Sequence, residues 1–369
     1  GEGVTYHTSK PTRYGKETIL AFSNGKPSEA FGAPYRVFDA ERKIARLPGP
    51  PFQFLDRVTE VTATAWRMEA GGEAEVEYFV PADAWYFGAN RQGAMPFAVL
   101  LETALQPCGW LAAYVGSALT SATDLSFRNL GGTAVQHREV TAASGVLTTR
   151  VKITRVAASG GMIIQNYDMR VTDAAGVVYE GETVFGFFSR EALANQVGVR
   201  EATPYVPDAT ETARGREFPY PEGAPFPARE FRMVDRIALF VADGGPAGLG
   251  FIRGTKVVDP QEWFFQAHFY QDPVCPGSLG LESFLQLLKV AAVERWGSGE
   301  ASRFQAVDLG KSHTWTYRGQ IVPTNREVTI EAVVTAVDDA ERVITAAGYL
   351  SVDGKVIYGM EDFTLRMEG

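Results

Sequence analysis

The sequence predicts an α+β fold built from two similar units. One observation is the stretch from Leu279 to Val293, in which only four polar residues interrupt an apolar sequence. A helix that is apolar on nearly every side is normally enclosed by other structure. Alternating apolar and polar stretches lie on both sides of it, as is typical of half-buried antiparallel strands. One enclosed helix for each long antiparallel sheet is an α+β arrangement.

The same pattern occurs twice in the chain. Three residues of the earlier copy recur 180 residues later, with Pro96, Glu102 and Gln106 matched by Pro276, Glu282 and Gln286. The aromatic stretch before each helix recurs at an offset of 178 residues, and this register pairs Asn90 with His268. The two units are therefore expected to form a pseudo-dimer within one chain, in which only the second unit carries the histidine.

Composition limits the classes of protein to consider. A length of 369 residues suits two fused units, and 45% apolar with 21% charged residues is ordinary for a globular protein. A net charge of −9 argues against nucleic acid as a partner. The chain has no run of eighteen apolar residues and no visible signal peptide, and Cys108 and Cys275 show no metal-ligand spacing. We expect a cytoplasmic protein without membrane insertion, and its start at glycine suggests a piece of a longer polypeptide.

The first half is expected to run as follows. Residues 1–50 contain repeated Gly and Pro and are predicted to be an extended lead-in segment. The first unit, residues 51–188, contains one expected helix at 97–115. Its expected strands lie within 59–70, 74–81, 146–158, 162–173 and 177–188.

The second half repeats this order. Residues 189–229, rich in Pro, Glu, Ala and Gly, are predicted to be a linker, and residues 230–369 form the second unit. An aromatic strand is expected to end at His268, with Ser278 as the helix N-cap. Further strands are expected at 326–337, 342–353 and 355–367.

The second unit carries the outline of an acid–base site. His268 precedes a Pro-Gly helix start, and Glu282 and Gln286 are four residues apart on one helix face. Cys275 is more readily explained as a small apolar filler than as a nucleophile. The other histidines have no supporting pattern and are interpreted as ordinary surface or core residues; they are His7, His137 and His313.

These motifs resemble a known family. His268, Asp272-Pro273-Val274, Pro276-Gly277, Leu279-Gly280-Leu281 and Glu282-x-x-x-Gln286 are similar to the active-site segment of bacterial β-hydroxyacyl-acyl-carrier-protein dehydratases, above all the β-hydroxydecanoyl type, which are hot-dog folds. The two-unit form, over roughly residues 35–369, resembles the double-hot-dog dehydratase domains of polyunsaturated fatty acid synthases and related iterative polyketide-type megasynthases. One departure is glutamate at 282, where the β-hydroxydecanoyl type usually carries aspartate.

The resemblance implies a crossed pairing of the site residues. In hot-dog dimers the histidine of one unit works with the carboxyl group on the helix of the other. His268 should then face Glu102 and Gln106, and Asn90 should face Glu282 in a vestigial site that lacks a histidine. Pairing of His268 with Glu282 inside one unit is the alternative. Glu102 could also simply form an ion pair with Arg91.

The resemblance also implies a reaction. The expected enzyme is a hydro-lyase that forms trans-2-enoyl thioesters on the phosphopantetheine arm of an acyl carrier protein, without a metal or organic cofactor. His268 would be the base, the paired carboxyl group the acid, and the Gly277 N–H a donor to the thioester oxygen. The carbonyl of Val274 would orient His268, while Pro276 and Arg318 would lie along the substrate. Whether the same groups also isomerise the double bond is left open.

The expected partners are an acyl carrier protein and the neighbouring domains of a megasynthase, and a homodimer is left open. An acidic carrier would need a basic patch, for which Arg91, Arg128, Lys311 and Arg318 are candidates. Two rival interpretations remain. One is a hot-dog thioester hydratase or thioesterase, and the other is a non-catalytic acyl-binding scaffold, which the degraded first unit would favour.

Overall fold

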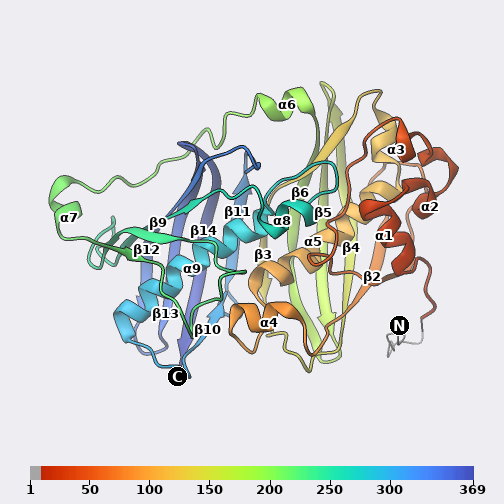
Figure 1. The fold of residues 1–369 in the computed structure, drawn as a ribbon. Helices are drawn as coiled ribbons and strands as arrows, with labels where there is room; N and C mark the ends of the chain where they lie inside the picture. Colours follow the sequence, from red (N-terminus) through yellow and green to blue (C-terminus); the bar gives the residue numbers. More distant parts are fainter. Residues whose placement is uncertain (1–9) are drawn as a thin grey trace.

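The computed structural model describes residues 10–369 as one antiparallel sheet with two long helices on the same face (Figure 1). The strands of the first repeat are β1 (Arg57–Val61), β2 (Glu73–Phe79), β3 (Leu125–Gln136), β4 (Val146–Ser159), β5 (Met162–Asp173) and β6 (Gly176–Ser189). Those that follow are β7 (Arg216–Pro219), β8 (Arg236–Val241), β9 (Phe251–Val257), β10 (Arg303–Ala306), β11 (Ser312–Tyr317), β12 (Glu327–Asp338), β13 (Val343–Val352) and β14 (Lys355–Glu368).

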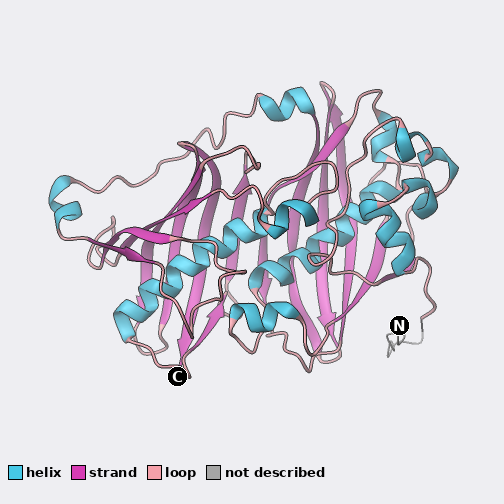
Figure 2. Ribbon diagram, in the orientation of Figure 1, coloured by secondary structure: helices cyan, strands magenta, loops and turns pink. Residues whose placement is uncertain are grey.

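The long helices lie across one face of the sheet, and α1 to α3 lie together at one end of it (Figure 2). The two long ones are α5 (Phe97–Tyr114) and α9 (Gly277–Trp296). The short ones are α1 (Lys16–Asn24), α2 (Pro27–Phe31), η1 (Ala33–Tyr35), α3 (Val37–Ala40), α4 (Trp85–Asn90), η2 (Ser117–Thr120), α6 (Arg190–Ala194), α7 (Ala209–Ala213) and α8 (Trp263–Ala267). No helix within residues 10–369 is both long and apolar enough to cross a membrane.

The sheet order is mirrored about its centre. It runs β1-β2-β4-β5-β6-β3-β11-β14-β13-β12-β9-β8-β7, and β10 pairs with β14 beside this path. The central pair, β3 with β11, is antiparallel and places Thr133 opposite Thr314; we call this pair the seam. Local details repeat on both sides, since Asp56 accepts a hydrogen bond from Phe79 N–H and Asp235 accepts one from Val257 N–H. The expected α+β class and the intramolecular pseudo-dimer are confirmed.

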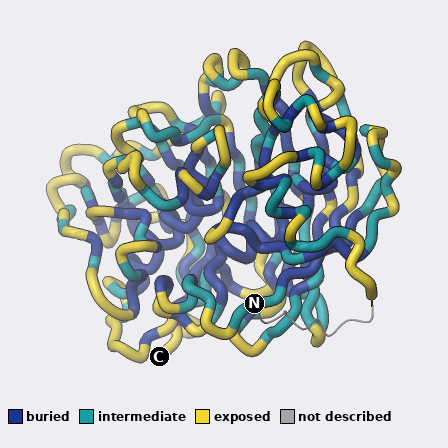
Figure 3. The backbone as a smooth tube through the Cα atoms, turned by 45° about the vertical axis from the view of Figure 1, so that its right-hand side comes forward, coloured by how far each residue is buried: buried dark blue, intermediate teal, exposed yellow. Residues whose placement is uncertain are grey.

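The core of each repeat is its long helix. The α5 helix packs against β2, β4 and β5, whereas α9 packs against β9 and β12 to β14, and the two helices touch each other. All residues of α9 from 278 to 292 are buried. Figure 3 shows that buried backbone lies at the centre of the molecule. Each helix is therefore enclosed by its own half of the sheet, which is the expected hot-dog arrangement.

Several local expectations are wrong. The segment before residue 50 is not extended, because α1, α2 and α3 form there and bury Ile19, Phe22 and Phe38 against the first repeat. The aromatic stretches before the long helices are themselves short helices, α4 and α8, and not strands. Residues 189–229 do more than connect the repeats, since they contain β7, which extends the sheet beside β8.

Ser278 is not the N-cap of α9. Pro276 occupies the cap position, α9 begins at Gly277, and the Ser278 hydroxyl instead donates a hydrogen bond to the side chain of Glu102 at 2.8 Å. This contact crosses from the second repeat to the first. The Ser278 side chain, which suggested a helix cap, therefore forms a contact between the two repeats.

Candidate active site

His268 directly follows α8, where the chain turns towards α9. Its Nδ1 lies 2.8 Å from the carbonyl oxygen of Val274. Because a carbonyl can only accept, Nδ1 carries the proton and Nε2 keeps a free lone pair. Burial lowers the pKa of His268 to about 3, so the ring is neutral at neutral pH. The expectation from the resemblance that Val274 orients this ring agrees with this contact.

Glu102 lies on α5 and is buried. Its carboxyl oxygens accept hydrogen bonds from the Gln106 amide at 2.9 Å and from the Ser278 hydroxyl at 2.8 Å. Burial raises the pKa of Glu102 to about 7, although both hydrogen bonds act in the opposite direction. A substantial fraction of this carboxyl group is therefore protonated at neutral pH.

Gln106 is held in one orientation by the backbone. Its amide nitrogen donates to the Phe52 carbonyl at 2.9 Å, and its amide oxygen accepts from the Phe54 N–H at 2.8 Å. In the second repeat Gln286 makes the same pair of contacts, with Phe231 and Met233. The glutamine thus ties each long helix to the segment before the first strand of its repeat, a structural role that the sequence did not indicate.

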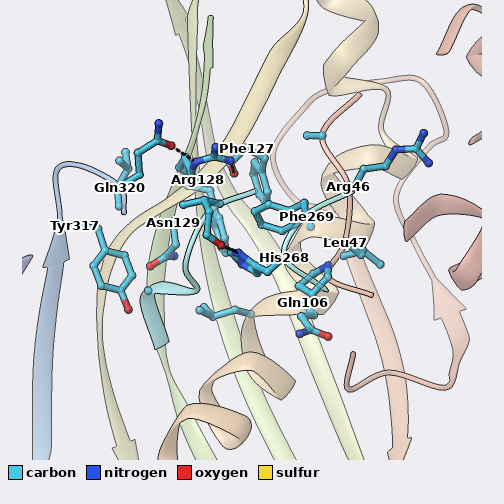
Figure 4. A pocket seen from close by; sticks show the side chains of 18 of the residues that line it. Arg46, Leu47, Gln106, Phe127, Arg128, Asn129, His268, Phe269, Tyr317 and Gln320 are labelled. Carbon is cyan, nitrogen blue, oxygen red and sulfur yellow. Dashed lines mark hydrogen bonds between the residues drawn. The ribbon is translucent and has the colours of Figure 1, made fainter. Parts of the chain in front are cut away.

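His268 and Glu102 line one pocket between the repeats, together with Val274, Cys275, Gly277 and Ser278. In Figure 4, His268 and Gln106 lie between Tyr317 and Gln320 on one side and Leu47 and Arg46 on the other. Glu282 is found in a separate small cavity with Asn90. The structure therefore brings together the crossed pairs and not the pair within the second repeat.

Tyr317 forms the wall opposite the start of α9. A Cβ atom added at Gly277 would lie only 2.6 Å from the Tyr317 ring and 2.9 Å from its hydroxyl, so only glycine allows this close approach. The Tyr317 hydroxyl is buried and has no hydrogen-bond partner among residues 10–369. A buried donor without a partner in the wall of a pocket is available to a ligand. The resemblance had placed only its neighbour, Arg318, along the substrate.

Five half-buried residues of the pocket wall come from β3, from the chain after α6 and from the chain after β11, and we call them the mouth; they are Arg128, Asn129, Gln196, Gly319 and Gln320. Arg128 forms an ion pair of 2.9 Å with Asp272 and donates a hydrogen bond to Gln320. Arg318 is exposed beside the mouth, and its guanidinium donates to the carbonyl of Leu130.

The candidate basic residues have separate partners. Lys311 pairs with Asp308 at 3.2 Å, and Arg91 donates to the carbonyl of Phe226. The Arg91 contact leaves Glu102 to its own partners, Gln106 and Ser278. The structure thus gives each of these cations a local role.

The cavity with Asn90 and Glu282 is the pseudo-symmetric counterpart of the site with His268 and Glu102, and side chains fill it. Asn90 stands where His268 stands, and Phe97 and Ala98 replace Gly277 and Ser278. Lys289, buried on α9, donates to the Asn90 side chain at 3.1 Å. Burial raises the pKa of Glu282 and lowers that of Lys289. The Phe97 side chain, the missing hydroxyl and the lysine together leave this position without the groups found around Glu102.

The remaining reactive side chains are placed as follows. Burial raises the pKa of the Cys275 thiol to about 12, so it is a neutral wall residue at neutral pH. His313 is buried at the seam against the Tyr179 hydroxyl, and His137 pairs with Glu180 at the surface. His7 lies outside the described residues. Within residues 10–369 no group of three potential metal-ligating side chains is present.

Comparisons with known proteins match both repeats. The model of the FabA-like domain matches residues 47–182 and 226–361. One subunit of the polyunsaturated fatty acid synthase of Thraustochytrium sp. is 32% identical over 95% of the chain, which spans only 26% of that relative. Among solved structures, a protein of Lactobacillus plantarum described as an oleoyl thioesterase has a TM-score of 0.48 at 11% identity, over 81% of this chain and 98% of that one. The dehydratase domain of the CurJ module of curacin polyketide synthase has a TM-score of 0.44 at 14% identity, over 85% and 96%.

Proposed function

The chain belongs to the family of FabA-like domains, and on this premise we propose that it removes water from β-hydroxyacyl thioesters. One observation carries the proposal. A neutral histidine of the second repeat and a carboxyl group of the first, with a pKa of about 7, line the same pocket. A base that is unprotonated and an acid that is still protonated at neutral pH are what the elimination of water requires.

The proposed reaction divides the work between these two groups. Nε2 of His268 accepts the proton from C2, and the electrons of that bond form the C2–C3 double bond. The C3–O bond breaks as the Glu102 carboxyl donates its proton to the leaving hydroxyl, which departs as water. Val274 keeps Nε2 unprotonated, while Gln106 and Ser278 hold the acid in position.

The thioester oxygen gains negative charge during this step. The N–H groups in the first turn of a helix have no intrahelical acceptor, and the helix dipole is positive there. Gly277 is the first residue of α9 and lines the pocket, so its N–H is our candidate donor to that oxygen. The Tyr317 hydroxyl, which lies against Gly277, is a second candidate.

The finer assignments belong to the same proposal. The product would be a trans-2-enoyl thioester, and the substrate would arrive at the mouth on the phosphopantetheine arm of an acyl carrier protein. The setting would be a cytoplasmic megasynthase with neighbouring domains, which the synthase component among the relatives supports. Every role assigned above is filled by a group of the chain itself, and we propose no metal or organic cofactor.

The test compares two matched variants in the two repeats. Production of enoyl thioester from a β-hydroxyacyl-pantetheine substrate is followed by ultraviolet absorbance for the wild type, Glu102→Gln and Glu282→Gln. We expect Glu102→Gln to lose at least about 10²-fold in kcat, the usual contribution of a general acid. Glu282→Gln should keep most of the activity, provided that its thermal unfolding shows a folded protein.

Other results would assign the protein differently. Loss of turnover in folded Glu282→Gln alone would mean that His268 works within its own repeat. Release of free thiol by the wild type would indicate a thioesterase. Binding of the substrate by the wild type without any product would indicate an acyl-binding scaffold.

A further inference from the structure

The pocket extends beyond the acid–base pair along one face of α5. Glu102, Gln106, Gly109 and Ala113 all line it, and their spacing of three or four residues places them in one row. At a rise of 1.5 Å per residue this row is about 16 Å long. Beyond Gly109 the row ends at Ala113, and the pocket is also lined by buried apolar residues from other segments, which are Phe22, Ile44 and Ala118; we call this the far end.

Part of this far end comes from the segment before the first repeat. Phe22 belongs to α1, and residues 44–48 run along the pocket after α3. Arg46 ties the two together, because its guanidinium donates to the carbonyls of Phe22 at 3.1 Å and Gly25 at 2.7 Å. The family match begins at residue 47, so α1 to α3 lie outside the matched region.

Two further hydrogen bonds fix this segment to the site. The buried Tyr35 hydroxyl donates to the carbonyl of Ala113 at the end of α5. The Gly49 N–H donates at 2.7 Å to the carbonyl of Ala267, the residue before His268. The far wall is thus held in place relative to both α5 and the histidine.

Gly109 leaves little room for added atoms in the wall of the pocket. A Cβ atom there would lie 3.2 Å from Cδ2 of Leu47 and 3.4 Å from Cε1 of Phe127, and all three residues line the pocket. We call these three residues the neck. The equivalent position on α9 is occupied by Lys289, whose side chain reaches Asn90 and fills the other cavity. At this position of the long helix, the open pocket therefore has a glycine and the filled cavity has a lysine.

We propose that the neck, above all Gly109 and Leu47, sets the length of the apolar acyl chain that the pocket accepts. The inference rests on the proposed function. A chain attached to the thioester at His268 and Glu102 must pass the neck to reach the far end. Short chains end before the neck, whereas long chains pass along the pocket beside Gly109 and Leu47, where a side chain at position 109 would push Leu47 and Phe127 into their path.

The experiment measures the ratio of kcat/KM for a β-hydroxydodecanoyl to a β-hydroxybutyryl pantetheine thioester. In Gly109→Val the ratio should fall at least about tenfold, because methyl groups occupy the passage. Gly109→Ala should give a smaller fall in the same direction. Leu47→Ala combined with Gly109→Val should bring the ratio back towards the wild-type value, since the first change removes the atoms that the second meets. Gly88→Ala, an exposed helical glycine with open space around it, is the matched control and should leave the ratio unchanged.

The outcomes separate this inference from the proposed function. If the wild type turns over neither substrate, the proposed function fails and the inference fails with it. If the wild type turns over both but folded Gly109→Val keeps the wild-type ratio, the neck does not select chain length. Failure of the folded double variant to recover the ratio would equally overturn the role of Leu47.

Discussion

Glu102 and His268 are buried in the same pocket, but burial has opposite consequences for their proton affinity. It raises the pKa of the carboxyl group to about 7 and lowers that of the imidazole to about 3. Each shift favours the neutral form, because charge is costly where water is excluded. The neutral acid holds a proton and the neutral base holds none, so burial alone prepares both for the same elimination.

This gives a prediction about pH. Turnover should fall as the pH rises through about 7, because Glu102 then loses the proton that it donates. His268 stays neutral over the same range. In Ser278→Ala the falling limb should move to higher pH, because the hydrogen bond that is lost favours the charged carboxylate and so lowers its pKa in the wild type. Profiles of kcat/KM against pH for the two proteins check this, and an unshifted limb would contradict the role of Ser278.

A second prediction concerns the Tyr317 hydroxyl. Tyr317→Phe should lower kcat by between about 10- and 10³-fold if the hydroxyl donates to the developing oxyanion. The free energy of unfolding should not decrease, because this buried hydroxyl has no hydrogen-bond partner among the described residues. Steady-state kinetics and urea denaturation measure the two quantities. Unchanged kcat would remove Tyr317 from the mechanism.

Among the elements, the two long helices and the strands β4 to β6 and β12 to β14 could be predicted from the sequence, whereas the seam strands β3 and β11 and the short helices were not. A nearly continuous apolar stretch identified α9, and alternation of apolar and polar residues identified those strands. The aromatic residues of α4 and α8 favour strands by propensity. In the structure both segments are helical, and Trp85 of α4 packs against Trp263 of α8 between the repeats. In the lead-in, Ile19 and Phe22 had helical spacing, but Gly and Pro nearby masked it.

The site was predictable only in part, because its residues come from segments far apart in the sequence. The motif around His268 is local, whereas its pairing with Glu102 came from the family resemblance. Ser278 contacts a carboxyl group 176 positions away and Lys289 contacts an amide 199 positions away. No pattern within one element reports such contacts, because tertiary structure alone brings the two side chains together.

The filled cavity gives a prediction about α9. Glu282 and Lys289 lie two turns apart on this buried helix, and each shifts the pKa of the other towards the charged form. In a double-mutant cycle with Glu282→Gln and Lys289→Met, the two losses of unfolding free energy should be coupled by about 1 kcal/mol. Urea denaturation of the four proteins measures the coupling. Additive losses would show that the two groups do not interact.

At the scale of the whole molecule, the seam rather than the covalent connection should hold the repeats together. Backbone pairing of β3 with β11 is supported by side-chain contacts across the seam, from Thr133 to Thr314 and from Trp315 to Asn129. The connection between α6 and α7 follows the edge of the molecule in Figure 1, and Val206 within it is 81% exposed.

Cleavage of this connection should therefore be tolerated. With a protease site inserted at Val206, the two fragments should elute together in size-exclusion chromatography after cutting, and turnover should persist. An uncut sample of the same variant is the control. Separation of the fragments, or loss of turnover on cutting, would show that the covalent connection is needed to keep the repeats paired.

The two repeats carry different residues at equivalent positions, and this difference has a consequence for how their sites can evolve. In a dimer of identical chains, one gene encodes both halves, so any mutation changes both sites at once. Phe97 or Lys289 in such a gene would have closed every site together. Duplication within one chain gives each half its own codons, and one half can lose its chemistry while the other keeps it.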